Sequence, residues 1–312
     1  CEFFLFNADE NGRPTTITNE QAGFFDMGPL DNGENARRDI VLTLEDMGFV
    51  VEASHHEKAP SQHEVDFRYD EALTTADNIM TFKLAVKTIA KHHGLHATFM
   101  PKPRKEFCGS GMHINMSLRK DGRNIFDDPN GENGLSKEAY YFMGGVMKHV
   151  KGICAVTNPL VNSYKRLKPG FEAPVYVAWS TLGANTLIRV PNMRGEHTRI
   201  ELRSPDPAAN PYLAFAACLM AGLDGIRNQI EPPAEVQDNI NILSEDEAQA
   251  RGLEKLPTDL LDACMEMKKD TLLKDLVGDR VFDQYYESKI AAWKEYDSQV
   301  TSWEIESYLY KF

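Results

Sequence analysis

Several carboxylate side chains occur where the sequence pattern does not predict simple exposure to water. Glu2 opens an apolar run that continues to Phe6, and Glu57 and Glu64 bracket a turn-like segment at 59–62. Converging carboxylates would suit Mg²⁺ or Mn²⁺ better than zinc, whose structural sites prefer thiolates. Spacing alone leaves a second interpretation open, in which Glu57 and Glu64 pair with surface Lys or Arg.

Two further candidate ligands lie in segments that alternate between polar and apolar residues. His113 belongs to the polar face of 112–118, and Glu201 shares the polar face of 199–203 with Arg199 and Arg203. Strict alternation predicts β-strands with one buried face. Simple solvation of the polar face is the usual outcome, but faces made of His, Glu and Arg favour a binding site.

Arginines are the third group that could do chemistry. Guanidinium groups bind phosphate and carboxylate through paired hydrogen bonds, and structural salt bridges are the alternative. Together with acidic metal ligands, they fit phosphoryl transfer. The candidates are Arg166, Arg189, Arg194, Arg199 and Arg203.

Composition and missing motifs exclude several other classes. The 34 Lys and Arg against 47 Asp and Glu give a net charge of −13, without the basic stripe that nucleic-acid binding needs. No apolar run reaches the ~18 residues of a membrane span. The 5 Cys are scattered without a C-x-x-C pair, as in cytosolic proteins with reduced thiols. P-loop, dinucleotide-binding, kinase and G-x-S-x-G motifs are absent from the chain.

Helical and strand patterns alternate along the chain and predict an α+β fold. An antiparallel sheet with a polar, metal-binding face would be backed by helices. Asn210 and Pro211 predict a helix start, as N-cap and first helical residue. The other expected helices cover 34–47, 79–94 and the tail around 282–296, and 234–256 is expected to be a loop.

Several blocks, in order along the whole chain, resemble glutamine synthetase of the bacterial type I class. The resemblance implies the catalytic-domain fold shared with guanido kinases. It also implies ATP-dependent ligation of ammonia to L-glutamate through a γ-glutamyl phosphate intermediate, giving glutamine, ADP and phosphate. The matching blocks are Glu2 to Phe6, His55 to Glu64, Lys87 to Pro103, Gly109 to His113, Asn162 to Pro174 and Arg203 to Tyr212.

The same resemblance implies a role for each candidate, with ATP and two to three Mg²⁺ or Mn²⁺ ions as cofactors. The implied metal ligands are Glu2, Glu57 and Glu64 for one ion and His113 and Glu201 for another. Implied catalytic residues are Glu172, Arg189 and Arg203, and implied glutamate-binding residues are Gly109, Arg166 and Arg203. The implied ATP-binding residues are Tyr69, Ser117, Arg189, Arg194 and Arg199.

Three departures from the family pattern bear on these expectations. Cys108 stands where Asn is common beside the glutamate-binding loop, and Cys1 stands where Pro is common. Residues 239–258 contain no Tyr, which indicates the subclass that is not adenylylated and is regulated by feedback. Nitrogen-regulatory protein partners are a further expectation for that subclass.

The chain starts with Cys1 inside an apolar run, so we expect a fragment whose N-terminal part is missing. The resemblance implies that this part is a β-grasp domain. Residues 1–312 would form the catalytic domain, with 257–312 as its helical C-terminal part. The family assembles as a cytoplasmic dodecamer of two hexameric rings, in which the upstream domain lends an Asp to a neighbouring site. The fragment alone would then be almost inactive.

Two alternatives to glutamine synthesis stay open from the residues. A sister ligase would join glutamate to another amine, such as a polyamine, with the same metal and ATP residues. A relative without catalysis would serve as a structural or regulatory assembly, although it would have no physical reason to keep buried charges.

Overall fold

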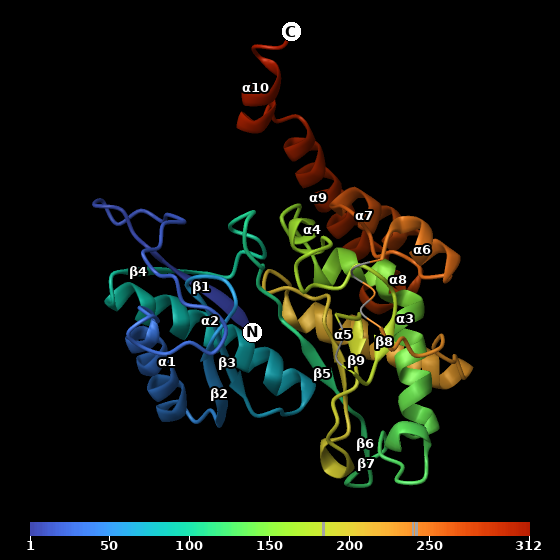
Figure 1. The fold of residues 1–312 in the computed structure, drawn as a ribbon. Coiled ribbons are helices and arrows are strands. Elements are labelled where there is room, and N and C mark those ends of the chain that lie inside the picture. The colour runs from blue at the N-terminus through green and yellow to red at the C-terminus, as the bar shows by residue number, and fades with distance from the viewer. Residues whose placement is uncertain (183–184, 239, 241–242) are drawn as a thin grey trace.

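The computed structural model describes residues 1–182, 185–238, 240 and 243–312 (Figure 1). The strands are Glu2–Asn7 (β1), Val51–His56 (β2), Gln62–Phe67 (β3), Leu95–Thr98 (β4), Ile114–Met116 (β5), Arg119–Lys120 (β6), Arg123–Asn124 (β7), Trp179–Ser180 (β8), Ile188–Arg189 (β9) and Ile200–Leu202 (β10). The α-helices are Glu34–Asp46 (α1), Ala72–His92 (α2), Lys137–Thr157 (α3), Ser163–Arg166 (α4), Pro211–Asn228 (α5), Glu245–Ala250 (α6), Leu260–Lys269 (α7), Leu272–Val277 (α8), Asp279–Asp297 (α9) and Ser302–Tyr308 (α10).

The first sheet contains the N-terminal strands in the order β2-β3-β1-β4, and every neighbouring pair is antiparallel. Helices α1 and α2 cover one of its faces. Phe3 and Leu5 from β1 are buried there against Ile40 of α1 and Phe82 of α2. Because side chains alternate across a strand, Glu2 points to the opposite face from Phe3.

The second sheet has the order β5-β10-β9-β8 and lies beside the first (Figure 1). The expected antiparallel pairing holds for β5, β10 and β9, while β8 runs parallel to β9. The α+β class is therefore confirmed, with the strands divided between two four-stranded sheets. The two strands predicted by alternation are present but shorter than their patterns, as β5 and β10.

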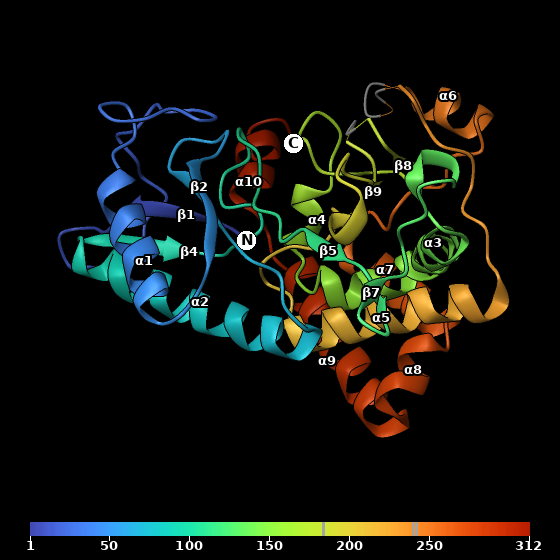
Figure 2. The ribbon, with the colours of Figure 1, turned by 90° about the horizontal axis from the view of Figure 1, so that it is seen from below.

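Buried helices form the layer behind the second sheet. Helix α3 packs along α5 and α7, and its inward face is almost wholly apolar. The predicted start of α5 is confirmed, because the Asn210 side chain accepts a hydrogen bond from the Leu213 N–H and Pro211 is the first helical residue. Figure 2 shows α2 and α5 end to end beneath both sheets. These two helices, which contact each other, therefore connect the helical layers behind the first and the second sheet.

The C-terminal region differs from its prediction in one place. Residues 245–250, inside the expected loop, form α6, whose first turn carries a capping box made by Ser244 and Glu247. That S-x-x-E pattern is a helix-start signal that the polar composition obscured. The tail is helical as expected, and α10 stands away from the rest of the described structure in Figure 1.

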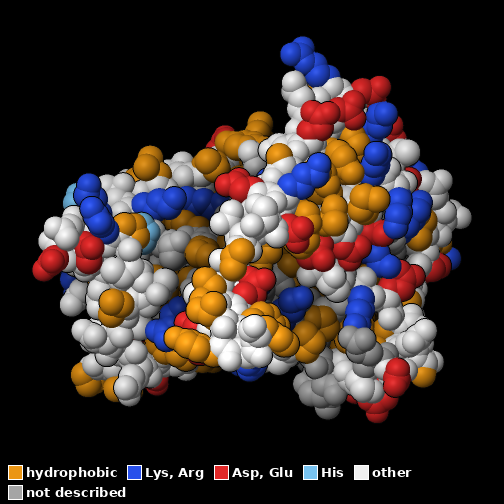
Figure 3. All heavy atoms as spheres, turned by 90° about the horizontal axis from the view of Figure 1, so that it is seen from above, with side chains coloured by type: hydrophobic (Ala, Val, Ile, Leu, Met, Phe, Trp, Pro, Cys, Tyr) orange, Lys and Arg blue, Asp and Glu red, His pale blue; other side chains and the backbone are white. Residues whose placement is uncertain are grey.

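The surface and the thiols agree with the composition. On the face seen in Figure 3, positive and negative side chains are interspersed. All five cysteines are free thiols. Of the helices described, none combines the length and the apolar character needed to cross a membrane.

Candidate active site between the two sheets

A cavity of about 390 Å³ lies where the two sheets meet. Residues from both sheets, from the segments beside them and from the 171–173 segment line it. The lining residues that the structure describes are Glu2, Phe24, Phe25, His55, Glu57, Lys58, Gln62, Glu64, Cys108, Gly109, His113, Arg166, Phe171, Glu172, Ala173, Asn185, Arg189, Glu201 and Arg203.

Glu2 ties the two sheets together at the floor of the cavity. Its backbone N–H donates to the Gly111 carbonyl at 3.0 Å, and its carboxylate accepts from the Gly111 N–H at 2.9 Å. Gln62 donates to the same carboxylate oxygen at 2.9 Å. Burial, followed by the nearby charges of Glu64 and Glu57, raises the pKa of Glu2 to about 8. An acid held in this way gains from any cation that enters the cavity.

The β2–β3 hairpin supplies the next carboxylates. The strand register places His55 opposite Glu64, and Glu64 opposite Glu2, so all three project from one face of the sheet. His55 Nε2 lies 2.8 Å from a Glu57 oxygen and 3.5 Å from a Glu64 oxygen. One ligand atom from each of these three residues lies within 4.8 Å of the others. Glu57 and Glu64 are thus paired with the His55 imidazole inside the cavity. The alternative from the sequence was that they pair with surface Lys or Arg.

His113 and Glu201 approach from the second sheet. His113 Nδ1 lies 3.2 Å from a Glu201 oxygen, and its Nε2 lies 4.0 Å from a Glu2 oxygen. Burial would raise the pKa of Glu201, but the hydrogen bond and charge of His113, with Arg203 and Arg189, lower it to about 2. Burial lowers the pKa of His113, which favours the neutral imidazole that a metal ion requires.

Arg189 and Arg203 flank Glu201 on its strand and on the neighbouring strand. Arg189 reaches a Glu201 oxygen at 2.5 Å, and Arg203 reaches the other oxygen at 3.4 Å. Within the described part of the chain, the buried Nε of Arg203 has no hydrogen-bond partner. A buried donor without a partner costs stability unless a ligand satisfies it, so this atom marks a place for an anionic group.

Arg166 is buried under the glycine-rich turn before β5. Its guanidinium donates to the Ser204 carbonyl at 2.7 Å and to the Arg203 carbonyl at 3.1 Å. A Cβ at Gly111 would lie 2.5 Å from Arg166 Nη2, and a Cβ at Gly109 would lie 2.2 Å from the Pro101 carbonyl. Only glycine fits this close approach of backbone and guanidinium.

The segment carrying Glu172 lies over the cavity. Lys58 forms an ion pair with the Glu172 carboxylate, and Cys108 lines the cavity together with Glu172. Lys102 Nζ lies 3.3 Å from the centre of the Phe171 ring. These contacts hold the segment against the 101–109 loop. Cys108 therefore lies at the edge of the cavity, close to this segment.

The remaining predicted ATP-binding residues are not in the lining of this cavity as far as it is described. Tyr69 and Ser117 are exposed, and Arg199 donates to the Asn115 side chain at 3.0 Å. Arg194 donates to the Asn133 carbonyl at 2.6 Å and to the Pro191 carbonyl. The predicted metal ligands, the predicted glutamate-binding residues and Glu172 therefore line the cavity. These four predicted ATP-binding residues lie outside its described lining.

Several lining residues were missed by sequence reasoning. Phe24 and Phe25 come from the segment between β1 and α1, and they pack edge to face at 4.6 Å. The Phe25 ring stacks on His55 at 4.7 Å. Two adjacent exposed aromatics in a polar loop were the available signal, because such residues need a partner or a ligand. Lys58 had no signal beyond its position beside Glu57.

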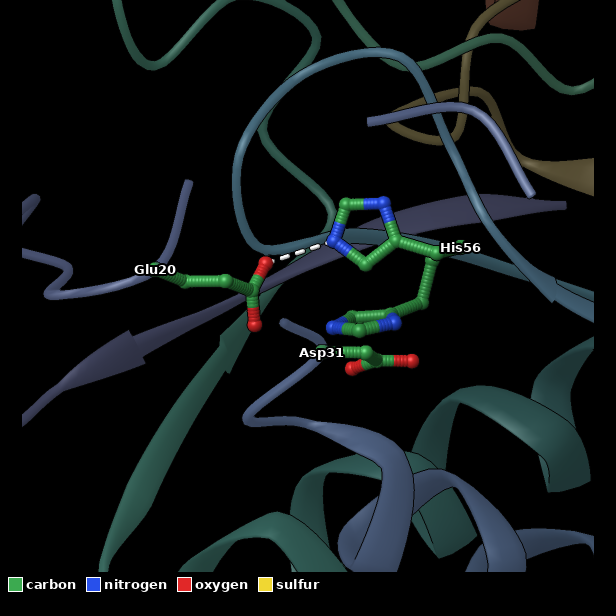
Figure 4. A group of neighbouring side chains, drawn as sticks. Glu20, Asp31 and His56 are labelled. Carbon is green, nitrogen blue, oxygen red and sulfur yellow. Dashed lines mark hydrogen bonds and ion pairs between the residues drawn. The ribbon is translucent and has the colours of Figure 1, made fainter. Parts of the chain in front are cut away.

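A second group of acids and imidazoles lies behind the hairpin, on the face away from the cavity. Figure 4 shows the Glu20 carboxylate directed at the His56 ring, with Asp31 close by. Glu20 accepts from His56 Nε2 and from the Ser61 N–H, both at 2.5 Å. Arg37 lies 2.5 Å from Asp31 and 2.8 Å from His63 Nδ1. This group, the Glu20 cluster, consists of Glu20, Asp31, Arg37, His56 and His63.

The cavity carries the donor set that a hard divalent cation prefers. Glu2, Glu57 and Glu64 offer carboxylate oxygens, and His113 and Glu201 offer an imidazole nitrogen and a further carboxylate. The pKa of Glu2 is raised to about 8 because this carboxyl is buried beside Glu64 and Glu57, so a bound cation would favour its ionised form. The residues present therefore fit Mg²⁺ or Mn²⁺.

Comparisons with known proteins agree with this arrangement. The family model for the catalytic domain of glutamine synthetase matches residues 1–308. Glutamine synthetase from Clostridium saccharobutylicum is 59% identical over 312 residues, which are 100% of this chain and 70% of that protein. Glutamine synthetase from Staphylococcus aureus strain MW2 is 54% identical over 311 residues, again 100% of this chain and 70% of that protein.

Solved structures share the fold over almost the whole chain. GmaS in complex with ADP superimposes with a TM-score of 0.88 at 36% identity, over 99% of this chain and 71% of that one. Plasmodium falciparum glutamine synthetase, solved by cryo-electron microscopy, gives a TM-score of 0.85 at 28% identity, over 98% of this chain and 73% of that one. The chain belongs to the glutamine synthetase family as its catalytic domain, and its reaction is the ATP-dependent ligation of ammonia to glutamate.

Proposed function

We propose that the cavity between the two sheets is the active site of this ligation, and that its residues bind the metal ions, activate glutamate and receive ammonia. One observation carries the proposal. Glu2, Glu57, Glu64, His113 and Glu201 come from distant parts of the chain and line one cavity. Convergence of this kind costs stability unless bound cations compensate the charge.

Divalent metal ions are the first part of the proposal. Glu2, Glu57 and Glu64 would hold one ion, and His113 with Glu201 would hold a second. A third ion would be shared with ATP. Such ions polarise phosphoryl oxygens and neutralise charge during transfer. Mg²⁺ and Mn²⁺ both fit the oxygen-rich donor set.

Glutamate activation is the second part. Arg166 and the backbone at Gly109 bind and orient glutamate, whose side-chain carboxylate attacks the terminal phosphorus of ATP. A carboxylate is a poor electrophile until it is phosphorylated, so the γ-glutamyl phosphate is the species that ammonia attacks. Arg203, with its buried Nε lacking a partner among the described residues, and Arg189 stabilise the transferring phosphoryl group.

The ATP nucleoside would lie beyond the cavity, toward Tyr69, Ser117, Arg194 and Arg199. The solved GmaS structure holds ADP, and its similarity over 99% of this chain supports a nucleotide site on the same scaffold. Exposed Tyr69 offers a ring for stacking, and the Ser117 and Arg199 side chains offer donors at the end of the second sheet.

The Glu172 segment is the proposed lid. An acyl phosphate hydrolyses if water reaches it, so the site must close before ammonia attacks. Gly170 has φ of 85°, a conformation that glycine adopts readily, immediately before the segment. Glu172 would bind ammonium and accept its proton, which leaves neutral ammonia as the nucleophile.

The wider assembly is also proposed. Residues 1–312 would form a single catalytic domain, with 257–312 as its helical part, preceded by a β-grasp domain in the whole protein. That domain would contribute an Asp to a neighbouring subunit in a cytoplasmic dodecamer of two rings. Nitrogen-regulatory proteins would be the partners. The chain matches 70% of the length of its curated relatives, which leaves room for such a domain.

Ammonia is the proposed amine. The relatives at 54–59% identity are named glutamine synthetase, so a polyamine ligase and a non-catalytic assembly are not favoured. In the full-length protein, phosphate release from ATP should depend on glutamate, Mg²⁺ and ammonia together. Release that requires a polyamine would move the assignment to the sister ligase, and no release with any amine would favour the non-catalytic assembly.

A further inference from the structure

We propose that Lys58 gates the amine site: its ammonium group occupies the Glu172 carboxylate when no amine is bound, and the incoming ammonium ion must displace it. The inference rests on the proposed function, because it takes Glu172 as the group that receives the amine. It adds a residue to which no role is otherwise assigned.

The first observation is the position of Lys58. It follows Glu57 directly in the turn of the β2–β3 hairpin, and both Lys58 and Glu172 line the cavity. Their side chains form an ion pair although they are 114 residues apart in sequence. Lysine is a protonated primary amine at neutral pH. The chain thus places an alkylammonium group of its own on the carboxylate proposed to bind the substrate cation.

The second observation is the aromatic surface beside this ion pair. Lys58 Nζ lies 5.7 Å from the centre of the Phe24 ring. Phe24 is held edge to face by Phe25, whose ring stacks on His55. A carboxylate combined with an aromatic face is a recognised binding surface for ammonium groups. Lys58 therefore occupies a cation site built from two separate segments of the chain.

The third observation is that the lid does not depend on Lys58. Lys102 Nζ lies 3.3 Å from the centre of the Phe171 ring, in the residue next to Glu172. This contact holds the lid on the 101–109 loop without help from Lys58. Removal of the Lys58 charge should therefore free the Glu172 carboxylate and leave the lid in place.

The ion pair between Lys58 and Glu172 is weak enough for an incoming ammonium ion to displace it. The Lys58 and Glu172 side chains are 43% and 46% exposed, so solvent screens their attraction. A weak internal competitor raises the apparent KM for ammonia by a small factor, about two- to fivefold, without blocking the reaction. Until ammonium arrives, the same group would cover the amine site and keep water from the acyl phosphate.

The test uses steady-state kinetics of the full-length protein. Lys58→Met keeps the apolar stem and removes the charge, and Lys58→Arg keeps the charge. Lys269→Met is the matched control, since Lys269 also pairs with a carboxylate, Glu266, but on the exposed surface of α7. For each variant we would measure KM for ammonia, KM for glutamate, and glutamate-dependent phosphate release without ammonia.

The proposal predicts a specific pattern. Lys58→Met should lower the KM for ammonia two- to fivefold, leave the KM for glutamate unchanged, and raise ammonia-independent phosphate release. Lys58→Arg and Lys269→Met should match the unmodified protein. An unchanged KM for ammonia in Lys58→Met, or equal shifts in both KM values, would overturn the gate. If the unmodified protein shows no turnover with glutamate and ammonia, the proposed function itself fails, which is a separate result.

Discussion

The two faces of the β2–β3 hairpin carry similar side chains in opposite electrostatic states. His55 and Glu64 project into the cavity with Glu2, whereas His56 and His63 project into the Glu20 cluster on the other face. Register alone produces this separation, because neighbouring residues of a strand point to opposite faces. The hairpin therefore builds two groups of ionisable residues back to back.

Charge compensation distinguishes the two groups. In the Glu20 cluster, Arg37 pairs with Asp31. Burial lowers the pKa of His56, but the hydrogen bond and charge of Glu20, with the Glu57 backbone and Asp31, together raise it. Each acid of this cluster thus has a basic partner within the protein. In the cavity, Glu2 accepts hydrogen bonds from the neutral donors Gln62 and Gly111, and burial beside Glu64 and Glu57 raises its pKa to about 8. The comparison teaches that the acids of the Glu20 cluster are paired inside the protein, whereas Glu2 is left for a bound cation to compensate.

The largest expected effect comes from removing one of the proposed metal ligands in the cavity. Glu57→Ala should lower kcat/KM about a thousandfold, because loss of a metal ligand removes several kcal/mol of transition-state stabilisation. The metal-free protein should keep most of its free energy of unfolding, because His55 loses Glu57 but retains Glu64 as a partner. Enzyme assays and urea unfolding with EDTA would measure the two quantities. Glu52→Ala, at an exposed position of the same strand, is the control.

A marked loss of metal-free stability in Glu57→Ala would contradict this expectation, because it would mean that the ion pair between His55 and Glu57 is part of the scaffold. Normal turnover would remove Glu57 from the proposed metal ligands.

The next largest effect is expected from removing a charged residue of the Glu20 cluster. Arg37→Met removes the cation that pairs with Asp31 and donates to His63, so buried charge is left without compensation. The free energy of unfolding should fall by about 3–5 kcal/mol, measured by urea unfolding with and without Mg²⁺. Arg38→Met changes a side chain that is 63% exposed and should alter stability little. Equal stability of the two variants would show that the cluster is not a self-compensated scaffold.

A smaller change tests whether the scaffold positions the cavity. Glu20 accepts from His56, from the Ser61 N–H and from the Asn32 N–H. Glu20→Gln keeps the size but replaces one acceptor by a donor, so the turn that follows Glu57 should loosen. Metal affinity should fall about tenfold, read from calorimetric titration with Mn²⁺. Glu10→Gln, in the exposed loop nearby, is the control, and unchanged affinity in Glu20→Gln would separate the two faces of the hairpin functionally.

Much of the fold could be predicted from sequence, because its signals are local. Helical spacing and the Asn210 cap located α5, and alternation located β5 and β10. The short helix α6 was missed because polar composition hid its capping box. Division of the strands into two sheets could not be predicted, since it depends on contacts such as Glu2 with Gly111, which no local pattern encodes.

The site was predictable in residue type more than in place. Alternation marked His113 and Glu201, and the turn-like segment at 59–62 marked Glu57 and Glu64, but only the resemblance to a family suggested that they converge. The Glu20 cluster uses the same kinds of residue as the cavity, so composition could not tell scaffold from site. Lys58 was missed because an isolated Lys in a turn is normally a solvated surface residue. Its partner, Glu172, is brought near only by the tertiary fold.

The smallest effect, taken per pH unit, is a pH dependence of stability to which Glu2 of the cavity contributes. The pKa of Glu2 rises from 4.5 to about 8 on folding, so between these values the folded state holds a proton that the unfolded state has released. The unfolded state then binds fewer protons, and the free energy of unfolding falls as pH rises, by about 1 kcal/mol per pH unit from this group. Urea unfolding with EDTA across this range should show this contribution, to which His55, with a pKa raised to about 10, adds a slope of the same sign. Glu2→Gln should reduce the slope by about 1 kcal/mol per pH unit, because an amide does not titrate, and saturating Mg²⁺ should reduce it by holding the carboxylate ionised. An unchanged slope in Glu2→Gln would place the proton elsewhere and would weaken the claim that Glu2 is left for a bound cation to compensate.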